Sequence, residues 1–410
     1  MIQFREYQSD LINKATVILN KYKFVYLSME VRTGKTLTAL GTLQSLMSVN
    51  KVLFITKKRA IGSIVWDYEQ LNPYYEIEVI NYESLHKVDQ KGWDAIVCDE
   101  AHSMGAFPRP SKRAKQVRSL LDKNDCYVVL LSGTPTPESF SQMYHQVYAI
   151  PNNPFKEHKT FYKFAKEHVN VIQKKINSFL INDYSRAKTS VLDQMKPFML
   201  SYTQKEAGFE TSIKELVLIV EAPPAIYNMC NKLKRDLVIE GSEHVILADT
   251  NVKLMQKLHQ MYSGTVKFED GKSMVLDTFK AEFIKKYFKD RKIAIFYKFK
   301  EEFNALKEVY GSELCNTLDE FCNTNKNIAL QIVSGREGIS LKDADCLVYY
   351  NIDFSATSYW QSRDRMTTKT RSDNTVYWVF TDKGIEPKIY RAVKNKKDYT
   401  LKHFKKDLLN

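Results

Sequence analysis

The chain has 410 residues, of which 44% are hydrophobic and 27% charged, so it can bury the cores of two or three domains and still be soluble. No apolar run approaches the roughly 18 residues of a membrane span, and no signal segment follows Met1, so we expect a cytoplasmic protein with no membrane partner. The six cysteines form no CxxC pair and are expected to be reduced. The net charge of +13 indicates either a polyanionic partner, most often nucleic acid, or a lysine-rich host composition, and composition favours neither.

The first part of the chain alternates short apolar runs with segments of helical spacing. Strands are predicted at 24–28, 52–56, 77–80, 95–98 and 127–131, and a helix begins at Thr36. Short strands separated by helices are typical of a parallel sheet covered by helices on both faces. We therefore predict an α/β domain over residues 1–140.

The composition changes between about Glu138 and Lys280, where lysines, glutamates and aromatics follow a helical period. Two prolines, Pro151 and Pro154, mark the break, and a helix is predicted over 225–240 after Pro223-Pro224. This pattern predicts a mainly helical insertion over residues 141–280.

Apolar strands return at 293–296, 328–333, 346–350 and 376–380, which predicts a second α/β domain over residues 281–410. From Lys383 onward the chain carries nine Lys/Arg and three acidic residues, so 9 − 3 gives +6. Such a run fits a solvated helix face or a surface that faces nucleic acid, and the run alone favours the solvated face.

A candidate phosphate-binding loop joins the first predicted strand to the helix that follows it. Its residues are Glu30-Val31-Arg32-Thr33-Gly34-Lys35-Thr36. Gly34 lets backbone N–H groups approach phosphate, Lys35 can neutralise the β- and γ-phosphates, and the Thr36 hydroxyl can ligate Mg²⁺. The match is incomplete because Met29 stands where the pattern has its first glycine, so an ordinary turn is the alternative.

An acidic pair, Asp99-Glu100, follows the strand at 95–98, and Ser132-Gly133-Thr134-Pro135 follows the strand at 127–131. We expect Asp99 to hold Mg²⁺ and Glu100 to polarise the attacking water. Adjacent acids usually form a solvated turn, but their position at a strand end, downstream of a GKT sequence, favours the metal site over that turn. Ser132, Gly133 and Thr134 are predicted to sense the state of the nucleotide.

The order GKT, DEAH, SGTP resembles the superfamily 2 helicases, and nearly the whole chain is similar to the Swi/Snf branch of DNA translocases, including small phage members. The resemblance implies two RecA-like parallel-sheet lobes around the helical insertion, with ATP and Mg²⁺ bound between the lobes. It also implies a bacterial or phage-infected host cell. Phe4-Arg5-Glu6-Tyr7-Gln8 resembles the family's adenine-recognising element, which points to Arg5 and Gln8.

Further motifs of the resemblance concern nucleic acid and the second lobe. Lys196 to Thr203 resembles the segment that joins the helical protrusions in the Swi/Snf branch. Ser334 to Leu341 resembles motif V and Gln361 to Arg365 resembles motif VI, in which Arg365 is the expected arginine finger and Arg363 its reserve. Thr368 stands where the family has a second arginine. The implied DNA contacts are Thr56, Lys57, Lys58, Asn81, Tyr82, Ser334, Gly335 and Arg336, and the further nucleotide contacts are Arg32, Thr33, Gly338 and Gln361.

The leading hypothesis is an ATP-dependent DNA helicase or translocase that moves on duplex DNA through phosphate contacts with weak sequence preference. One alternative is an RNA helicase. Another is a nucleic-acid-binding protein on the same fold that hydrolyses no ATP, although Lys35, Asp99 and Glu100 are all present. A motor subunit of a larger protein complex is a third.

Overall fold

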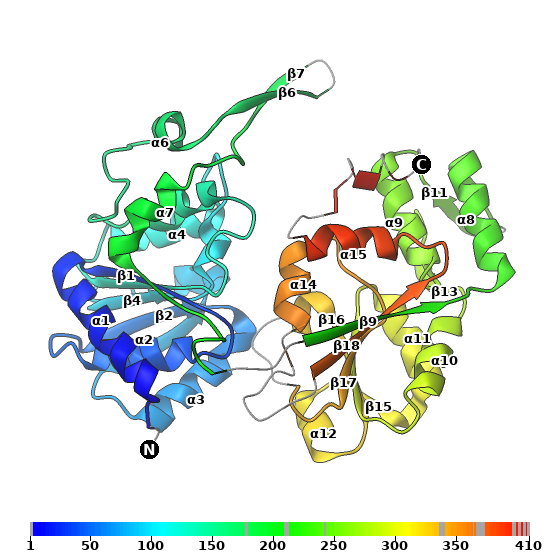
Figure 1. Cartoon of the computed structure of the whole chain (residues 1–410), viewed down its shortest axis with the longest axis horizontal. Helices are drawn as coiled ribbons and strands as arrows, with labels where there is room; N and C mark the ends of the chain where they lie inside the picture. The colour runs from blue at the N-terminus through cyan, green and yellow to red at the C-terminus, as the bar shows by residue number, and fades with distance from the viewer. Residues whose placement is uncertain are drawn as a thin grey trace. The chain divides into compact units, whose positions relative to one another are not determined.

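The computed structural model describes residues 3–176, 179–208, 213–241, 243–335, 341–363, 365, 374–395, 399–400, 403–404 and 407. The chain divides into two compact units, Met1–Phe209 and Glu210–Asn410 (Figure 1). Each unit contains one six-stranded sheet whose neighbouring strands all run parallel. The predicted α/β class with two parallel sheets is therefore confirmed.

The sheet of the first unit has the strand order β3-β2-β4-β5-β1-β8. In chain order its strands are β1 (Phe24–Met29), β2 (Lys51–Thr56), β3 (Glu76–Asn81), β4 (Ala95–Cys98), β5 (Tyr127–Leu131) and β8 (Met199–Tyr202). The helices are α1 (Glu6–Tyr22), α2 (Lys35–Gln44), α3 (Ile61–Leu71), α4 (Lys112–Leu121), α5 (Met143–Val147), α6 (Phe161–His168) and α7 (Ser190–Met195). An antiparallel hairpin of β6 (Ile172–Ile176) and β7 (Phe179–Asp183) projects beyond α6 (Figure 1).

Alternate residues of the central strands feed two separate cores. Val25 and Leu27 pack with α1, α2 and α3, whereas Phe24 and Tyr26 pack with α4 to α7 on the other face. A strand that is covered on both faces must be apolar at every position, which is why these strands are continuous hydrophobic runs.

The sheet of the second unit has the order β15-β16-β14-β17-β18-β9. In chain order its strands are β9 (Ile213–Val220), β14 (Ile293–Tyr297), β15 (Leu314–Cys315), β16 (Asn327–Gln331), β17 (Cys346–Tyr349) and β18 (Asn374–Thr381). The helices are α8 (Pro224–Asp236), α9 (Asn251–Met261), α10 (Phe279–Tyr287), α11 (Lys300–Tyr310), α12 (Leu318–Asn323), α13 (Ile332–Gly335), α14 (Ala356–Arg363) and α15 (Glu386–Lys394). Two small antiparallel pairs, β10 (Val238–Glu240) with β11 (Val245–Leu247) and β12 (Thr265–Lys267) with β13 (Ser273–Val275), complete it.

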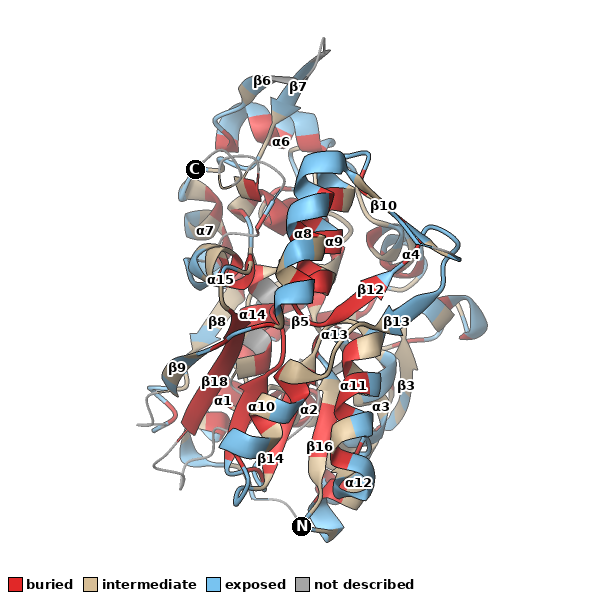
Figure 2. Cartoon of the chain, turned by 90° about the vertical axis from the view of Figure 1, so that its right-hand side faces the viewer, coloured by how far each residue is buried: buried red, intermediate tan, exposed pale blue. Residues whose placement is uncertain are grey.

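Burial follows the same layering in the second unit. Figure 2 shows β18 buried along its length and α8 exposed on its outer side. Helices α10 and α11 contribute to one core, and α8, α9, α12, α14 and α15 contribute to the other. No helix among the described residues is long and apolar enough to cross a membrane.

The division into two units differs from the predicted three parts. The boundary at Phe209 and Glu210 falls inside the expected insertion of residues 141–280. That range contributes β8 to the first sheet and β9 to the second, and it also holds the β6–β7 hairpin and four short strands. The helical period of this range predicted its helices but not these strands, because edge strands carry polar residues on their open side.

Candidate functional site

The phosphate-loop candidate connects β1 to α2, as the sequence predicts. Gly34 is the residue before α2 and has a φ of 78°, and Arg32 has a φ of 65°, so both lie in the left-handed region. A side chain at Gly34 would also collide with Gln8, because a Cβ there would lie 2.3 Å from Nε2 of Gln8. Lys35 and Thr36 form the first turn of α2 and are partly exposed, so the loop presents a helix N-terminus, a cation and a hydroxyl together.

The start of α1 lies directly against this loop. The Gln8 side chain accepts a hydrogen bond from the backbone N–H of Arg5 (3.0 Å) and donates one to the carbonyl of Gly34 (3.4 Å). The Tyr7 hydroxyl donates to the carbonyl of Thr33 (3.1 Å), and Arg5 donates to that hydroxyl (2.9 Å). The structure therefore brings the predicted residues Arg5 and Gln8 to the predicted phosphate loop.

The segment after β8 supports the other side of the loop. The backbone N–H of Gln204 donates to the Glu30 carboxylate (2.7 Å), and the Gln204 side chain donates to the carbonyl of Val31 (2.9 Å). β8 itself pairs with β1 from Tyr26 to Met29. The segment from Lys196 to Thr203, expected to join protrusions, is thus a short turn and an edge strand beside the phosphate loop.

The acidic pair lies at the end of β4, at the same edge of the sheet because β1 and β4 run parallel to β5 between them. The Thr56 hydroxyl donates to Oδ2 of Asp99 (2.8 Å), and the Tyr82 hydroxyl donates to the carbonyl of Asp99 (2.7 Å). Glu100 has a φ of 51°, a strained conformation for a residue with a side chain.

Burial and neighbouring charges separate the two carboxylates. Burial raises the pKa of Asp99 to about 6, and the charge of Glu100 adds to the increase, while Lys35 and the Thr56 hydrogen bond oppose it. Burial also acts to raise the pKa of Glu100, but the hydrogen bond and charge of His102 and the charges of Lys57 and Lys35 outweigh it and hold that pKa below its usual range. Glu100 is therefore the more readily ionised of the two acids, whereas added positive charge would stabilise the ionised form of Asp99.

His102 joins the acidic pair to the loop after β5, a role that the sequence did not assign to it. Its Nδ1 lies 3.1 Å from Oε2 of Glu100 and 3.0 Å from Oγ of Ser132. Gly133 approaches the phosphate loop so closely that a Cβ there would lie 3.3 Å from the carbonyl oxygen of Met29 and 3.5 Å from Nζ of Lys35. The three motifs of the first unit are therefore in contact. The one sequence feature that could have indicated this role is the presence of a histidine two residues after Glu100.

The expected nucleic-acid contacts of the first unit fall into two groups. Thr56 and Tyr82 are completely buried and hold Asp99, so their side chains do not face a DNA backbone in this structure. Lys57 is partly exposed and Lys58 is exposed, whereas Asn81 donates to the Glu83 carboxylate (3.0 Å). Only the lysines and Asn81 keep accessible polar groups.

Several predicted residues of the second unit lie outside the described part. Arg336 and Gly338 are outside it. Ser334 and Gly335 end α13 and Gln361 lies in α14, but the side chains of Ser334 and Gln361 are outside the described part. Arg365 is 7% exposed, and its carbonyl accepts from the N–H of Leu341 (2.9 Å).

Arg363 is held by a carboxylate that the sequence did not single out, Glu215 of β9. The two form an ion pair of 3.0 Å, with side chains 19% and 7% exposed, and the guanidinium lies 4.0 Å from the centre of the Trp360 ring. Glu215 also accepts hydrogen bonds from Tyr359 (2.7 Å), Trp378 (2.9 Å) and Tyr390 (3.1 Å). The sequence did not predict this hydrogen-bond network, because Glu215 is a single charged residue on an edge strand and belongs to no recognisable motif.

Comparison with known proteins gives one match to a family model and two similar solved structures. Residues 48–220, less than half of the chain, match the SNF2-related domain. A search of curated protein sequences finds no match. Among solved structures, the Sulfolobus solfataricus SWI2/SNF2 ATPase core in complex with dsDNA has 16% identity and a TM-score of 0.44, with 96% of this chain and 91% of that chain covered. The ATPase core domain from the same organism has the same identity and TM-score, with 97% and 89% covered.

The match to the SNF2-related domain contains the acidic pair and the loop after β5, and the phosphate loop precedes it. All three motifs follow strands of the one parallel sheet of the first unit. Residues 48–220 are thus similar to the SNF2-related domain.

Proposed function

We propose that the chain hydrolyses ATP with Mg²⁺ and uses that reaction to move along double-stranded DNA. The observation that carries the proposal is the convergence of Lys35 and Thr36 with Asp99 and Glu100 at one edge of the first sheet. The +13 charge and the SNF2-related domain support a DNA partner.

The residues of the first unit fit a magnesium site. Asp99 is a buried carboxylate whose pKa stays raised despite the charge of Lys35, and hard oxygen donors such as a carboxylate and a hydroxyl are what Mg²⁺ prefers. Thr36 and Asp99 would hold the ion, which supplies positive charge to the phosphate oxygens when bound.

The protein's own groups have separate tasks in this proposal. The backbone of residues 32–34 and Lys35 bind the phosphates, and Gln8 and Arg5 fix the loop and contact the base. Glu100, held ionised beside His102, accepts a hydrogen bond from the attacking water and orients it. Ser132, Gly133 and Thr134 transmit the state of the nucleotide, because His102 connects Ser132 to Glu100.

DNA contacts are proposed at Lys57, Lys58 and Asn81 in the first unit and at Ser334, Gly335 and Arg336 in the second. The contacts are with phosphates, so sequence preference is weak and affinity falls with added salt. The arginine finger is proposed to be Arg365, and Gly338 and Gln361 are proposed to contact the nucleotide.

The test measures ATP hydrolysis with no nucleic acid, single-stranded DNA, double-stranded DNA and RNA. We expect the largest stimulation from double-stranded DNA and a loss of about 100-fold or more in Lys35→Ala and in Glu100→Gln. Displacement of a third strand without unwinding would identify translocation. Stimulation by RNA alone would favour an RNA helicase, and no stimulated hydrolysis in the wild type would refute the motor.

A further inference from the structure

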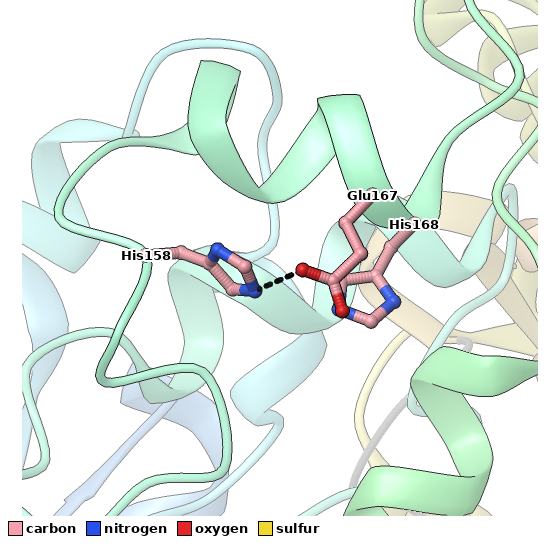
Figure 3. A group of neighbouring side chains, drawn as sticks. All are labelled: His158, Glu167 and His168. Atoms are coloured by element: carbon pink, nitrogen blue, oxygen red, sulfur yellow. Dashed lines mark ion pairs between the residues drawn. The ribbon is translucent and has the colours of Figure 1, made fainter.

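A second cluster of metal-binding side chains lies in the first unit, outside the phosphate loop and the acidic pair. His158 precedes α6, and Glu167 and His168 are its last two residues (Figure 3). Nε2 of His158 lies 3.4 Å from one carboxylate oxygen of Glu167, and Nε2 of His168 lies 3.6 Å from the other. The potential ligand atoms all lie within 4.8 Å of one another, and no other group of three such residues occurs in the described part of the chain.

His168 has a buried nitrogen with no hydrogen-bond partner. The side chain is 2% exposed, and its Nε2 is buried and unsatisfied. A buried polar atom without a partner is costly and uncommon in a folded protein. This atom points into the cluster, where a bound ion would give it a partner (Figure 3).

The rest of the structure holds the imidazole of His168 and the backbone of His158 in place. Nδ1 of His168 lies 3.0 Å from Oγ of Ser190, and its ring packs against Phe164 with centroids 5.0 Å apart. The backbone of His158 is fixed because its carbonyl accepts from the Tyr144 hydroxyl (2.7 Å). A second group bound to the other ring nitrogen is the usual support of a metal-ligating histidine, since it fixes the tautomer and the ring orientation.

The spacing favours an ion over direct hydrogen bonds. Hydrogen bonds between N–H and O are about 2.7–3.2 Å long, and both nitrogen-to-carboxylate distances here are longer. Two ligand atoms on a tetrahedral zinc ion, each at about 2.0–2.1 Å from the metal, lie about 3.3 Å apart. This is near the 3.4 Å and 3.6 Å that separate the two imidazole nitrogens from different oxygens of Glu167. We propose that His158, Glu167 and His168 bind a zinc ion, with the fourth position open to water.

The donor set selects the metal. Two imidazole nitrogens and one carboxylate oxygen suit zinc and its transition-metal neighbours, whereas Mg²⁺ and Ca²⁺ prefer oxygen alone. The Glu167 side chain is 60% exposed, so the ion has a route from solvent.

The position suggests that the ion stabilises the base of the β6–β7 hairpin. The carbonyl of His168 accepts from the N–H of Lys188 (2.8 Å), and Val169 pairs with Ala187 directly below the hairpin. Zinc would connect the loop at His158, the end of α6 and, through Ser190, the start of α7. Its effect is therefore expected on stability and on the hairpin, not on ATP chemistry.

The experiment titrates Zn²⁺ into the full chain, stripped with a chelator and kept in excess Mg²⁺ so that the magnesium site is occupied. We expect one zinc per chain, a rise in Tm on binding, and the visible absorption of tetrahedral Co²⁺ when cobalt replaces zinc. Glu167→Gln, His158→Ala and His168→Ala should each weaken binding at least 100-fold, and Ser190→Ala about tenfold. His86→Ala, a change at an exposed histidine elsewhere in the unit, should bind as the wild type does.

Glu167→Gln is the decisive variant, because its exposed side chain can change without disturbing the core even if His168→Ala fails to fold. Uptake of zinc by Glu167→Gln equal to that of the wild type would overturn the proposal, as would no zinc uptake by the wild type. Loss of zinc binding in Glu167→Gln with retained ATP hydrolysis would support it.

Discussion

The imidazole of His102 lies between two motifs that are separated in the sequence, the acidic pair and the loop after β5. Its Nδ1 is near both Glu100 and Ser132, so movement of the loop after β5 would alter the environment of the Glu100 carboxylate. Glu100 also carries a left-handed backbone conformation. Strain and a shared hydrogen-bonding group at one residue are typical of a functional site whose geometry the surrounding fold enforces.

Asp67 of α3 should make the stability of the first unit depend on pH. Burial raises its pKa to about 6, above the value of 3.8 for an unperturbed aspartate. The folded state therefore binds the proton more tightly, and the cost of the buried charge is fully present above pH 6 and absent below pH 4. We expect Asp67→Asn to raise the free energy of unfolding by about 1 kcal/mol at pH 7.5, after discount for partial exposure.

Urea unfolding at pH 4, 5, 6 and 7.5 measures this effect, and the gain should shrink to about zero at the lowest pH. Asp10→Asn, at an exposed position of α1, is the control and should show no such pH-dependent gain. A gain that is independent of pH would mean that Asp67 acts through something other than its charge.

The residues that sequence reasoning identified correctly as neighbours are those in contiguous motifs at strand ends. Lys35, Asp99 and Ser132 follow three strands of one parallel sheet, so their proximity follows from topology. The roles of Thr56 and Tyr82 were not predictable in this way. Burial depends on packing from other elements, and both side chains turn inward to Asp99.

The loop between β1 and α2 requires a glycine at position 34 for two independent reasons. Its φ is 78°, and a Cβ would lie 2.3 Å from the Gln8 amide. We expect Gly34→Ala to weaken ATP binding about tenfold or more and to destabilise the first unit by about 1–3 kcal/mol, because the loop and α1 must both shift. Nucleotide titration and thermal unfolding measure the two effects.

Gly62→Ala is the matched control for this loop. Gly62 lies in α3, and a Cβ there meets no atom within 4 Å. Alanine favours a helix by about 0.5–1 kcal/mol relative to glycine, so this change should stabilise slightly and leave nucleotide binding intact. If the two variants bind nucleotide and unfold alike, the backbone conformation of Gly34 is not required for nucleotide binding.

Arg363, the last residue of α14, has contacts that give it a structural role. Arg363 is committed to Glu215 and Trp360, so Arg363→Ala leaves a buried carboxylate without its cation and should cost about 3 kcal/mol of stability. Arg365→Ala should instead lower kcat about a thousandfold at saturating ATP, the loss expected for an arginine finger. Thermal unfolding and steady-state ATPase assays separate these effects. If Arg363→Ala abolishes hydrolysis without lowering Tm, the assignment must be exchanged.

The central strands and the edge strand β3 were predictable, whereas the edge strands β8, β9 and β15 were not. Runs such as Val52 to Ile55 are apolar throughout because both faces are covered, and they predicted β2 and its neighbours. β9 mixes Lys214 and Glu215 with apolar residues, and β8 is four residues long. Such edge strands give neither a continuous apolar run nor a clean alternation of apolar and polar residues. The sequence of residues 141–280 therefore predicts helices and not these strands.

At the scale of the whole chain, the hydrophobic cores are separate. Each of the four clusters of described buried residues draws on one unit only, so each unit has its own sheet and its own two cores. Domains with independent cores often unfold in separate steps. We therefore expect calorimetry of the intact chain to resolve two thermal transitions.

Matched core truncations can assign these transitions. Leu19 in α1 and Leu306 in α11 are both completely buried, one in each unit. A buried Leu→Ala change costs about 2–5 kcal/mol, which lowers the Tm of a domain of this size by about 5–15 °C. Leu19→Ala should lower one transition and Leu306→Ala the other. If both variants lower the same transition by similar amounts, the two units unfold as one cooperative body and the separate cores do not imply separate folding.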